Sequence, residues 1–209
     1  MIEKMNMSKV EQKKQLKEKR LLTAAFDLFS SKGVNDTSIS DIVTHAGIAK
    51  GTFYLYFKDK YQLLDIIVQE KTDELLIDAM KSANEKQFEN AIDQVVHMGD
   101  YIMDYLDQNK KMLKIIYKDL SWGVFSRTRE YDDKNYDRLK PIQDKFIDNI
   151  VALGKKRDDA EKELYLILEL IGGIMYNAIV HEKPYTLKEI RSSLIVMVRR
   201  MIKKIKTPT

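Results

Sequence analysis

The 209-residue sequence contains no cysteine and few of the residues that interrupt helices. Without a thiol the chain forms no disulfide and no thiolate metal site, which suits a reducing compartment. Only 3 prolines and 8 glycines occur, so long uninterrupted helices are permitted. No long run alternates between apolar and polar residues, as a half-buried strand would. These absences predict an all-α protein.

Long apolar runs are also missing. The longest, from Leu170 to Val180, is shorter than the roughly 20 residues that a membrane-spanning helix needs. Glu169 and His181 border it on either side. The opening residues, MIEKMNMSKV, have none of the apolar core of a signal peptide. We therefore expect no membrane partner and a cytoplasmic location.

Motifs typical of catalytic sites do not occur either. The sequence has neither a nucleophile elbow nor a glycine-rich phosphate-binding loop. Its three histidines, His45, His97 and His181, are far apart along the chain. Acidic pairs such as 132–133 and 158–159 are expected on solvated surfaces when 33% of residues are charged. We predict no catalytic residue, no metal site and no cofactor, and an enzyme is the least favoured class.

Neither sign of charge dominates, since 36 Lys and Arg stand against 32 Asp and Glu. The distribution is more informative than the net charge of +4. Residues 1–60 hold 11 basic and 7 acidic residues, and the remainder holds 25 of each. The whole basic excess thus lies in the first 60 residues, as contact with phosphate would require. The lysine-rich stretch up to Arg20 fits either an arm on the DNA backbone or minor groove, or a solvated leader.

The most distinctive segment, 37–64, predicts two short helices joined by a tight turn. Apolar residues recur at helical spacing across 39–46. Ser38 precedes this run and Asp41 follows three residues later, a pattern that caps a helix N-terminus. Gly47 tolerates the positive φ with which a helix can end sharply. The first of the two helices should therefore span about 39–46.

The second helix is predicted over 49–57 and has two different faces. Phe53 and Phe57 are four residues apart and should point inward, whereas the other side is polar or small. This is the layout of a helix-turn-helix, which places one helix in the major groove of DNA. Lysines can bind phosphates there, and hydroxyl groups or a methyl group can meet base edges. The expected DNA contacts are Ser38, Lys50, Gly51, Thr52, Tyr54, Tyr56, Lys58 and Lys60.

A set of residues within 14–68, about a quarter of the chain, stands at the spacing of a known family. They are Ala24, Phe26, Phe29, Gly33, Thr37, Ile42, Ala46, Gly47, Lys50, Gly51, Tyr54, Phe57, Lys60 and Leu64. On these residues the segment resembles the DNA-binding domain of the TetR family of bacterial repressors. Ala49 departs from the pattern, because many members carry Ser or Thr there. The missing capping hydroxyl should cost about 1 kcal/mol of local helix stability and removes one phosphate contact.

Helical periodicity continues through the rest of the chain. We expect a DNA-binding domain over 1–60, with an arm at about 1–12, and a larger ligand-binding and dimerisation domain over 61–209. Leu22, Ala25, Phe26 and Phe29 should form the inner stripe of the first helix, and Leu64, Ile67, Val68 and Leu75 that of the fourth. Helices are expected at about 10–32 or 13–32, 39–46, 49–57, 60–80, 88–109, 110–126, 131–153, 158–181 and 187–206.

Two apolar stripes near the C-terminus suggest a subunit interface. The resemblance implies that the last two helices pair with their copies in a four-helix bundle. Two recognition helices about 34–36 Å apart can then read the half-sites of a near-palindromic operator. The alternative is that both stripes are the core of a single chain. The expected interface residues are Leu164, Ile167, Leu168, Ile171, Gly172, Met175, Ile190, Leu194, Met197 and Met201.

Aromatic and methionine residues gather in the middle of the chain, within 92–146. The resemblance implies a small-molecule effector site in this region, and such side chains can line an apolar pocket. They suit a plain helical core equally well. The candidate pocket residues are His97, Tyr101, Tyr105, Tyr117, Trp122 and Phe125.

Taken with the resemblance, these features predict a DNA-binding transcriptional regulator. The leading hypothesis is a homodimeric repressor that a small-molecule ligand releases from its double-stranded operator. The alternative is a DNA-bound structural factor or cell-division adaptor that keeps the fold and needs no ligand.

Overall fold

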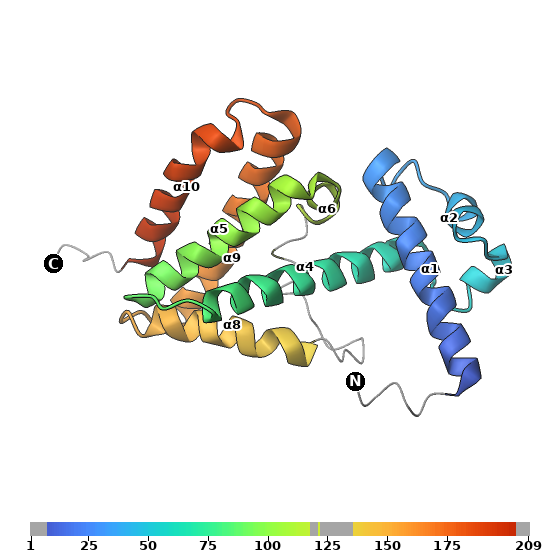
Figure 1. Ribbon diagram of the computed structural model, residues 1–209, viewed down its shortest axis with the longest axis horizontal. Coiled ribbons are helices and arrows are strands. Elements are labelled where there is room, and N and C mark those ends of the chain that lie inside the picture. The colour runs from blue at the N-terminus through green and yellow to red at the C-terminus, as the bar shows by residue number, and fades with distance from the viewer. Residues whose placement is uncertain (1–7, 118–120, 122–135, 204–209) are drawn as a thin grey trace. The chain divides into compact units, whose positions relative to one another are not determined.

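The computed structural model describes residues 8–117, 121 and 136–203, and every regular element among them is helical (Figure 1). This agrees with the all-α prediction. The chain divides into two compact units, Met1–Ile67 and Val68–Thr209. The division falls inside α4 (Lys60–Asn84), seven residues after the expected boundary at 60/61. Leu63 and Ile67, in the first two turns of α4, are buried, which accounts for their place in the N-terminal unit.

The N-terminal unit consists of α1 (Lys9–Lys32), α2 (Ile39–Ala46), α3 (Lys50–Phe53) and the start of α4. α1 packs against α2, and α2 against α3. Each fully buried large apolar side chain contributes about 1.5–3 kcal/mol relative to an exposed one. A small set of such side chains therefore holds these short helices together. The side chains with no exposed surface are those of Leu21, Ala25, Ile42, Phe53 and Leu63.

Three residues expected on the inner faces of α1 and α4, Leu22, Phe26 and Leu64, are only half-buried. Leu21 and Leu63 are fully buried, whereas their neighbours Leu22 and Leu64 are only half-buried. Both positions are Leu-Leu pairs, so the apolar pattern alone permits either register. Packing within the unit selects the first leucine of each pair.

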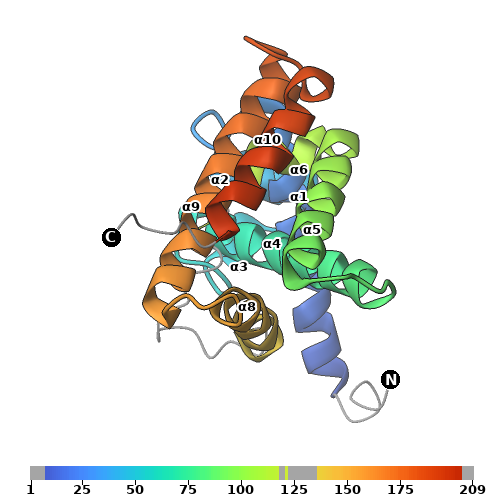
Figure 2. The same cartoon turned by 90° about the vertical axis from the view of Figure 1, so that its left-hand side faces the viewer.

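The C-terminal unit is a bundle of longer helices. α10 packs against both α5 and α9, and α8 packs against α5 and α9 (Figures 1 and 2). After the remainder of α4, the described elements are α5 (Ala91–Gln108), α6 (Lys110–Ile116), α8 (Tyr136–Val151), α9 (Arg157–Tyr176), the π-helix η2 (Asn177–His181) and α10 (Leu187–Ile202).

Ion pairs join α10 to α5. The Arg191 guanidinium binds Asp100 at 2.9 Å and also Asp104, and further along α10 Arg199 binds Asp93. The hydrogen bond from Arg191 holds the pKa of Asp104 below its ordinary value. Partly exposed pairs of this kind contribute at most about 1 kcal/mol each. They therefore fix the register of α10 on α5 more than they stabilise the bundle.

The 25-residue stretch Arg157–His181 is long and apolar enough, by length and composition alone, to cross a membrane, since an 18-residue window within it has a mean hydropathy of 1.5. The apolar run seen in the sequence is shorter because it begins after Glu169, whereas the helix continues through that residue. Core helices of soluble proteins pass the same test. One side of α9 is buried in its own chain, and since only 44% of the apolar window is buried, its other side is open.

Candidate nucleic-acid interface

α2 begins with a reciprocal pair of capping hydrogen bonds. The backbone N–H of Asp41 donates to Ser38 Oγ at 3.1 Å, and the N–H of Ser38 donates to Asp41 Oδ2 at 2.9 Å. Lys32 binds the same carboxylate at 2.8 Å. The bonds from Lys32 and Ser38 hold the pKa of Asp41 well below its ordinary value. The predicted cap is confirmed, and the exposed Ser38 hydroxyl keeps its own proton for donation.

α2 ends at Gly47, as predicted, in the left-handed conformation with φ 63° and ψ 43°. The N–H of Ile48 closes the turn on Val43 O at 2.9 Å. Arg20, on α1, donates from its guanidinium to Ala46 O and to Gly47 O. The sequence suggested that Arg20 belongs to a DNA-contacting or solvated tail. In the structure it instead satisfies carbonyl groups left open at the end of α2.

We call residues 49–57, the second helix expected in the helix-turn-helix, the recognition segment. Its helical part is shorter than predicted. α3 covers only Lys50–Phe53, and its N-cap, Ala49, makes no side-chain hydrogen bond. Beyond it the chain continues in tighter turns, with N–H groups of Leu55 and Tyr56 bonded three residues back at 3.2 and 2.9 Å. A single uncapped turn has little stability of its own. Tertiary packing must therefore hold 49–57 in place.

That packing comes from two phenylalanines. Phe53 and Phe57 are 0% and 2% exposed, with ring centroids 5.7 Å apart. Tyr54 is 55% exposed, and its ring packs edge-on against Phe53 with centroids 5.4 Å apart. The predicted inward direction of both phenylalanines is confirmed, and Tyr54 lies outward as expected. Because Phe53 and Phe57 are anchored, the outward residues have fixed positions.

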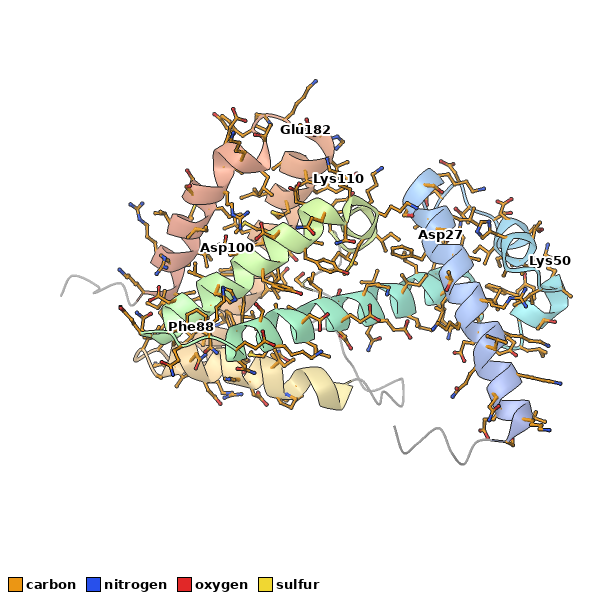
Figure 3. The ribbon with its side chains drawn as sticks, in the orientation of Figure 1. Asp27, Lys50, Phe88, Asp100, Lys110 and Glu182 are labelled. Carbon is orange, nitrogen blue, oxygen red and sulfur yellow. The ribbon has the colours of Figure 1, made fainter. Side chains whose placement is uncertain are left out.

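Most of the expected contact residues lie on this outward side. Lys50, Gly51, Tyr54 and Lys58 are exposed, while Thr52 and Tyr56 are half-buried; Lys50 is labelled at α3 in Figure 3. Leu55, which the sequence pattern did not single out, is 78% exposed. From the sequence alone, a leucine between two tyrosines could be buried in its own chain or exposed for contact with a partner.

Lys60 differs from the other expected contacts because its amine is already bound. Nζ donates to Val34 O at 2.7 Å, Thr37 O at 3.0 Å and Asn35 O at 3.1 Å. An ammonium group has three protons to donate. All three have carbonyl partners in the loop between α1 and α2. In this conformation Lys60 ties the start of α4 to that loop and is not directed at a phosphate.

Lys60→Met should lower the free energy of unfolding by about 1–3 kcal/mol, because three carbonyl groups are deprived of a charged donor. It should leave unchanged the slope of log affinity for DNA against log salt concentration. Lys58→Met is the matched control: its side chain is exposed, so its removal should spare stability and reduce that slope by about 0.9 for each phosphate that Lys58 neutralises. Denaturant unfolding and titrations at several salt concentrations measure both. A reduced slope for Lys60→Met would contradict this role.

The described residues among those predicted to line an effector pocket lie in separate contacts. His97 Nε2 lies 3.0 Å from Ser82 Oγ, and its ring faces Phe88. Tyr117 stacks on Tyr176 with centroids 3.7 Å apart. Tyr101 and Tyr105 are half-buried on α5. Trp122 and Phe125 lie outside the described residues.

A small apolar cavity does occur elsewhere in the C-terminal unit. Its volume is about 40 Å³, well below the roughly 150 Å³ of an apolar cavity known to accept benzene. None of the described residues predicted for the pocket lines it. The lining residues are Leu76, Met98, Ile142, Gln143, Phe146, Leu164 and Leu168.

Most residues predicted for the subunit interface are buried within their own chain. Met197 is 45% exposed, Ile190 and Met201 are half-buried, and the others (Leu164, Ile167, Leu168, Ile171, Gly172, Met175 and Leu194) are buried. The exposed apolar side chains on the same two helices are Tyr165 at 45%, Leu166 at 51% and Val196 at 45%, together with Met197. We call these four residues the α9–α10 face. Because the middle of α9 is apolar nearly all round, its periodicity did not separate the two sides.

Comparison with known proteins gives the family. The family model for "Bacterial regulatory proteins, tetR family" matches residues 21–67. An HTH-type transcriptional regulator of Staphylococcus aureus (strain USA300) is 31% identical over 130 residues, which cover 61% of this chain and 69% of that one. The uncharacterized HTH-type regulator YvdT of Bacillus subtilis is 49% identical over 53 residues, 25% of this chain and 27% of that one. Two further Bacillus subtilis relatives are covered over 51% and 61% of their lengths.

Solved structures share the fold at low sequence identity. The fatty acid degradation regulator FadR from Bacillus halodurans superimposes with a TM-score of 0.61 at 17% identity, over 92% of this chain and 97% of that one. A TetR-family regulator from Streptomyces coelicolor gives 0.65 at 15% identity, over 89% and 97%. From the helix-turn-helix geometry, the family model and the Staphylococcus relative together, the chain belongs to the TetR family of bacterial regulatory proteins, a class of transcriptional regulators and not of enzymes.

Proposed function

We propose that the protein is a DNA-binding transcriptional regulator that acts as a homodimeric repressor in the cytoplasm and leaves its near-palindromic operator when a small-molecule effector binds. One observation carries the DNA-binding part. The outward side of 49–58 is held in place by the buried Phe53 and Phe57 and presents exposed tyrosine and lysine side chains.

Five residues of this segment have chemistry that suits a duplex. Lys50 and Lys58 are exposed cations that can neutralise phosphates. Gly51 has no side chain, and nothing lies within 4 Å of the position that a Cβ would take, so a sugar-phosphate backbone can approach closely. Thr52 and Tyr54 carry hydroxyl groups that can bond base edges or phosphates. Together they form a surface that positions the protein and reads sequence.

The α9–α10 face supports the homodimer. Tyr165 and Leu166 on α9 are about half-exposed, as are Val196 and Met197 on α10, which packs against α9. Large apolar side chains left exposed on two packed helices are candidates for an interaction surface. A second copy of the chain supplies the same patch, so a two-fold contact is self-complementary. Two copies then present two recognition segments to two half-sites.

Release by an effector follows the family expectation and works by a population shift. An effector that prefers a conformer unable to bind both half-sites weakens DNA binding. Moving the protein from 1:99 to 99:1 between two conformers takes about 5.5 kcal/mol of differential affinity. The second candidate function is a DNA-bound structural or cell-division adaptor without effector, which needs no cavity larger than the one described, about 40 Å³. Occupancy of a few promoters in cells supports the regulator, and occupancy spread along the chromosome supports the adaptor.

Replacing Tyr54 tests the DNA-binding proposal directly. Tyr54→Ala should weaken specific binding by roughly 30-fold or more, because a contact worth about 1–3 kcal/mol is lost in each of the two half-sites. The control is Tyr185→Ala, since Tyr185 is 56% exposed against 55% for Tyr54 but lies in the C-terminal unit. Gel shift on a duplex selected by the wild-type protein from a random pool gives the affinities. Circular dichroism confirms that both variants fold, and equal affinities would argue against the proposal.

A further inference from the structure

Leu55 differs from the other outward residues because its side chain is apolar and yet exposed to solvent. It is 78% exposed, more than Tyr54 beside it at 55%. Its backbone is not loose, since its N–H is bonded to Thr52 O at 3.2 Å and it lies between the anchored Phe53 and Phe57. The protein therefore holds a branched apolar side chain in water at a fixed place.

We infer that Leu55 is a specificity-determining residue that contacts the C5-methyl group of a thymine in the major groove; the inference rests on the proposed DNA binding. An aliphatic side chain offers phosphates no hydrogen bond and no charge. In the major groove the thymine methyl is the apolar feature that distinguishes one base pair from the others. Burying that methyl against Leu55 removes apolar surface of both partners from water.

The surroundings of Leu55 indicate DNA as the occupant. Lys50 and Lys58, both exposed, flank the same segment on either side. A protein partner that buried Leu55 would also have to bury or pair these cations, whereas DNA supplies phosphates for them. Val10 is equally exposed at 78%, but it lies at the start of α1, apart in sequence from the recognition segment. An exposed apolar side chain alone therefore does not indicate a DNA contact. The exposure of Leu55 does, because it lies between exposed lysines in the recognition segment.

Thr52 is the competing source of a methyl contact. Its side chain has a methyl group as well as a hydroxyl, and it is half-buried. Leu55 is the more accessible of the two and has no polar atom in its side chain. Thr52→Ser removes that methyl and keeps the hydroxyl, so this variant separates the two possibilities.

A double-mutant cycle between protein and DNA tests the inference. The duplex is one selected by the wild-type protein from a random pool, and each thymine in turn is replaced by uracil, which removes only the methyl. For the wild-type protein we expect one or two positions per half-site at which uracil weakens binding about three- to fivefold, the effect of one buried methyl. For Leu55→Ala the penalty at those positions should vanish, while Thr52→Ser should retain it.

The outcomes separate the inference from the function on which it rests. If Leu55→Ala keeps the full uracil penalty, or if no uracil substitution affects the wild-type protein, the Leu55 contact is wrong while DNA binding stands. If Thr52→Ser abolishes the penalty and Leu55→Ala does not, the methyl contact belongs to Thr52. Failure of the wild-type protein to select any duplex would overturn the proposed function and the inference together.

Discussion

Leu166→Glu should convert the proposed homodimer into monomers and abolish tight binding to the proposed operator. Leu166, which is 51% exposed, belongs to the α9–α10 face. In a two-fold interface this substitution places two carboxylates in or near the same apolar contact, where a charge without a partner is costly to bury. Monomers bind one half-site at a time. Linking two binding modules commonly raises affinity by about 10²- to 10⁴-fold, so affinity should fall by a factor of that order.

Analytical ultracentrifugation and gel shift measure the two effects of Leu166→Glu. Met197→Glu on α10 should act in the same direction, since Met197 belongs to the same face. Tyr185→Glu is the control, because it puts an acid at a site that is 56% exposed but outside that face. It should leave both mass and affinity unchanged. A dimeric Leu166→Glu variant with wild-type affinity would exclude the α9–α10 face as the interface.

Phe53→Ala should destabilise the N-terminal unit by about 3–5 kcal/mol, the usual cost of removing a buried phenylalanine. Phe53 has no exposed surface and packs against the rings of both Tyr54 and Phe57. Because α3 has only one turn and no side-chain cap, the recognition segment has little else to hold it. Operator binding should fall along with stability.

Hydrogen exchange of the full-length protein measures the loss of stability in Phe53→Ala separately for each helix. Amides of α1 and α2 should become less protected, whereas those of α9 and α10, in the other compact unit, should keep their protection. Phe53→Leu, which stays apolar and fills most of the space, should cost about 1.5 kcal/mol or less. Equal protection in Phe53→Ala and wild type would show that the phenylalanine does not anchor the recognition segment.

Local signals made α2 the best-predicted element. Ser38, Asp41 and Gly47 act within a few residues of the helix ends that they define, and such signals are readable in a sequence. The inward direction of Phe53 and Phe57 was equally readable, because it depends on a spacing of four residues. The short length of α3 could not be predicted. The sequence shows a helical pattern over 49–57 but not that the chain tightens into three-residue turns after Phe53.

Long-range contacts to backbone atoms could not be predicted from the sequence. Lys60 binds carbonyl groups 23 to 26 residues away, and Arg20 binds carbonyl groups 26 and 27 residues away. A carbonyl group belongs to every residue, so no residue type marks the partner. A lysine or arginine near a DNA-binding motif therefore suggests a phosphate contact until the fold shows where its donors go.

The apolar stripes of α9 and α10 pose a different difficulty. Periodicity identifies the apolar side of a helix. It does not tell whether residues of the same chain or of a second subunit bury that side. Leu164 and Ile167 are buried in the chain itself, while Leu166 between them is open. Only the packed structure separates these sides: it keeps Met197 in the proposed interface and adds Tyr165, Leu166 and Val196.

A substitution at Gly47 would also affect Arg20. The φ of 63° at Gly47 already disfavours any other residue, and a Cβ there would lie 2.8 Å from Arg20 Nη2. That nitrogen is also bonded to the carbonyl groups of Ala46 and Gly47, so it cannot move aside without giving up the bonds. A residue with a Cβ at this turn would therefore disturb the arginine as well as the backbone, so the two positions are coupled in their effect on the end of α2.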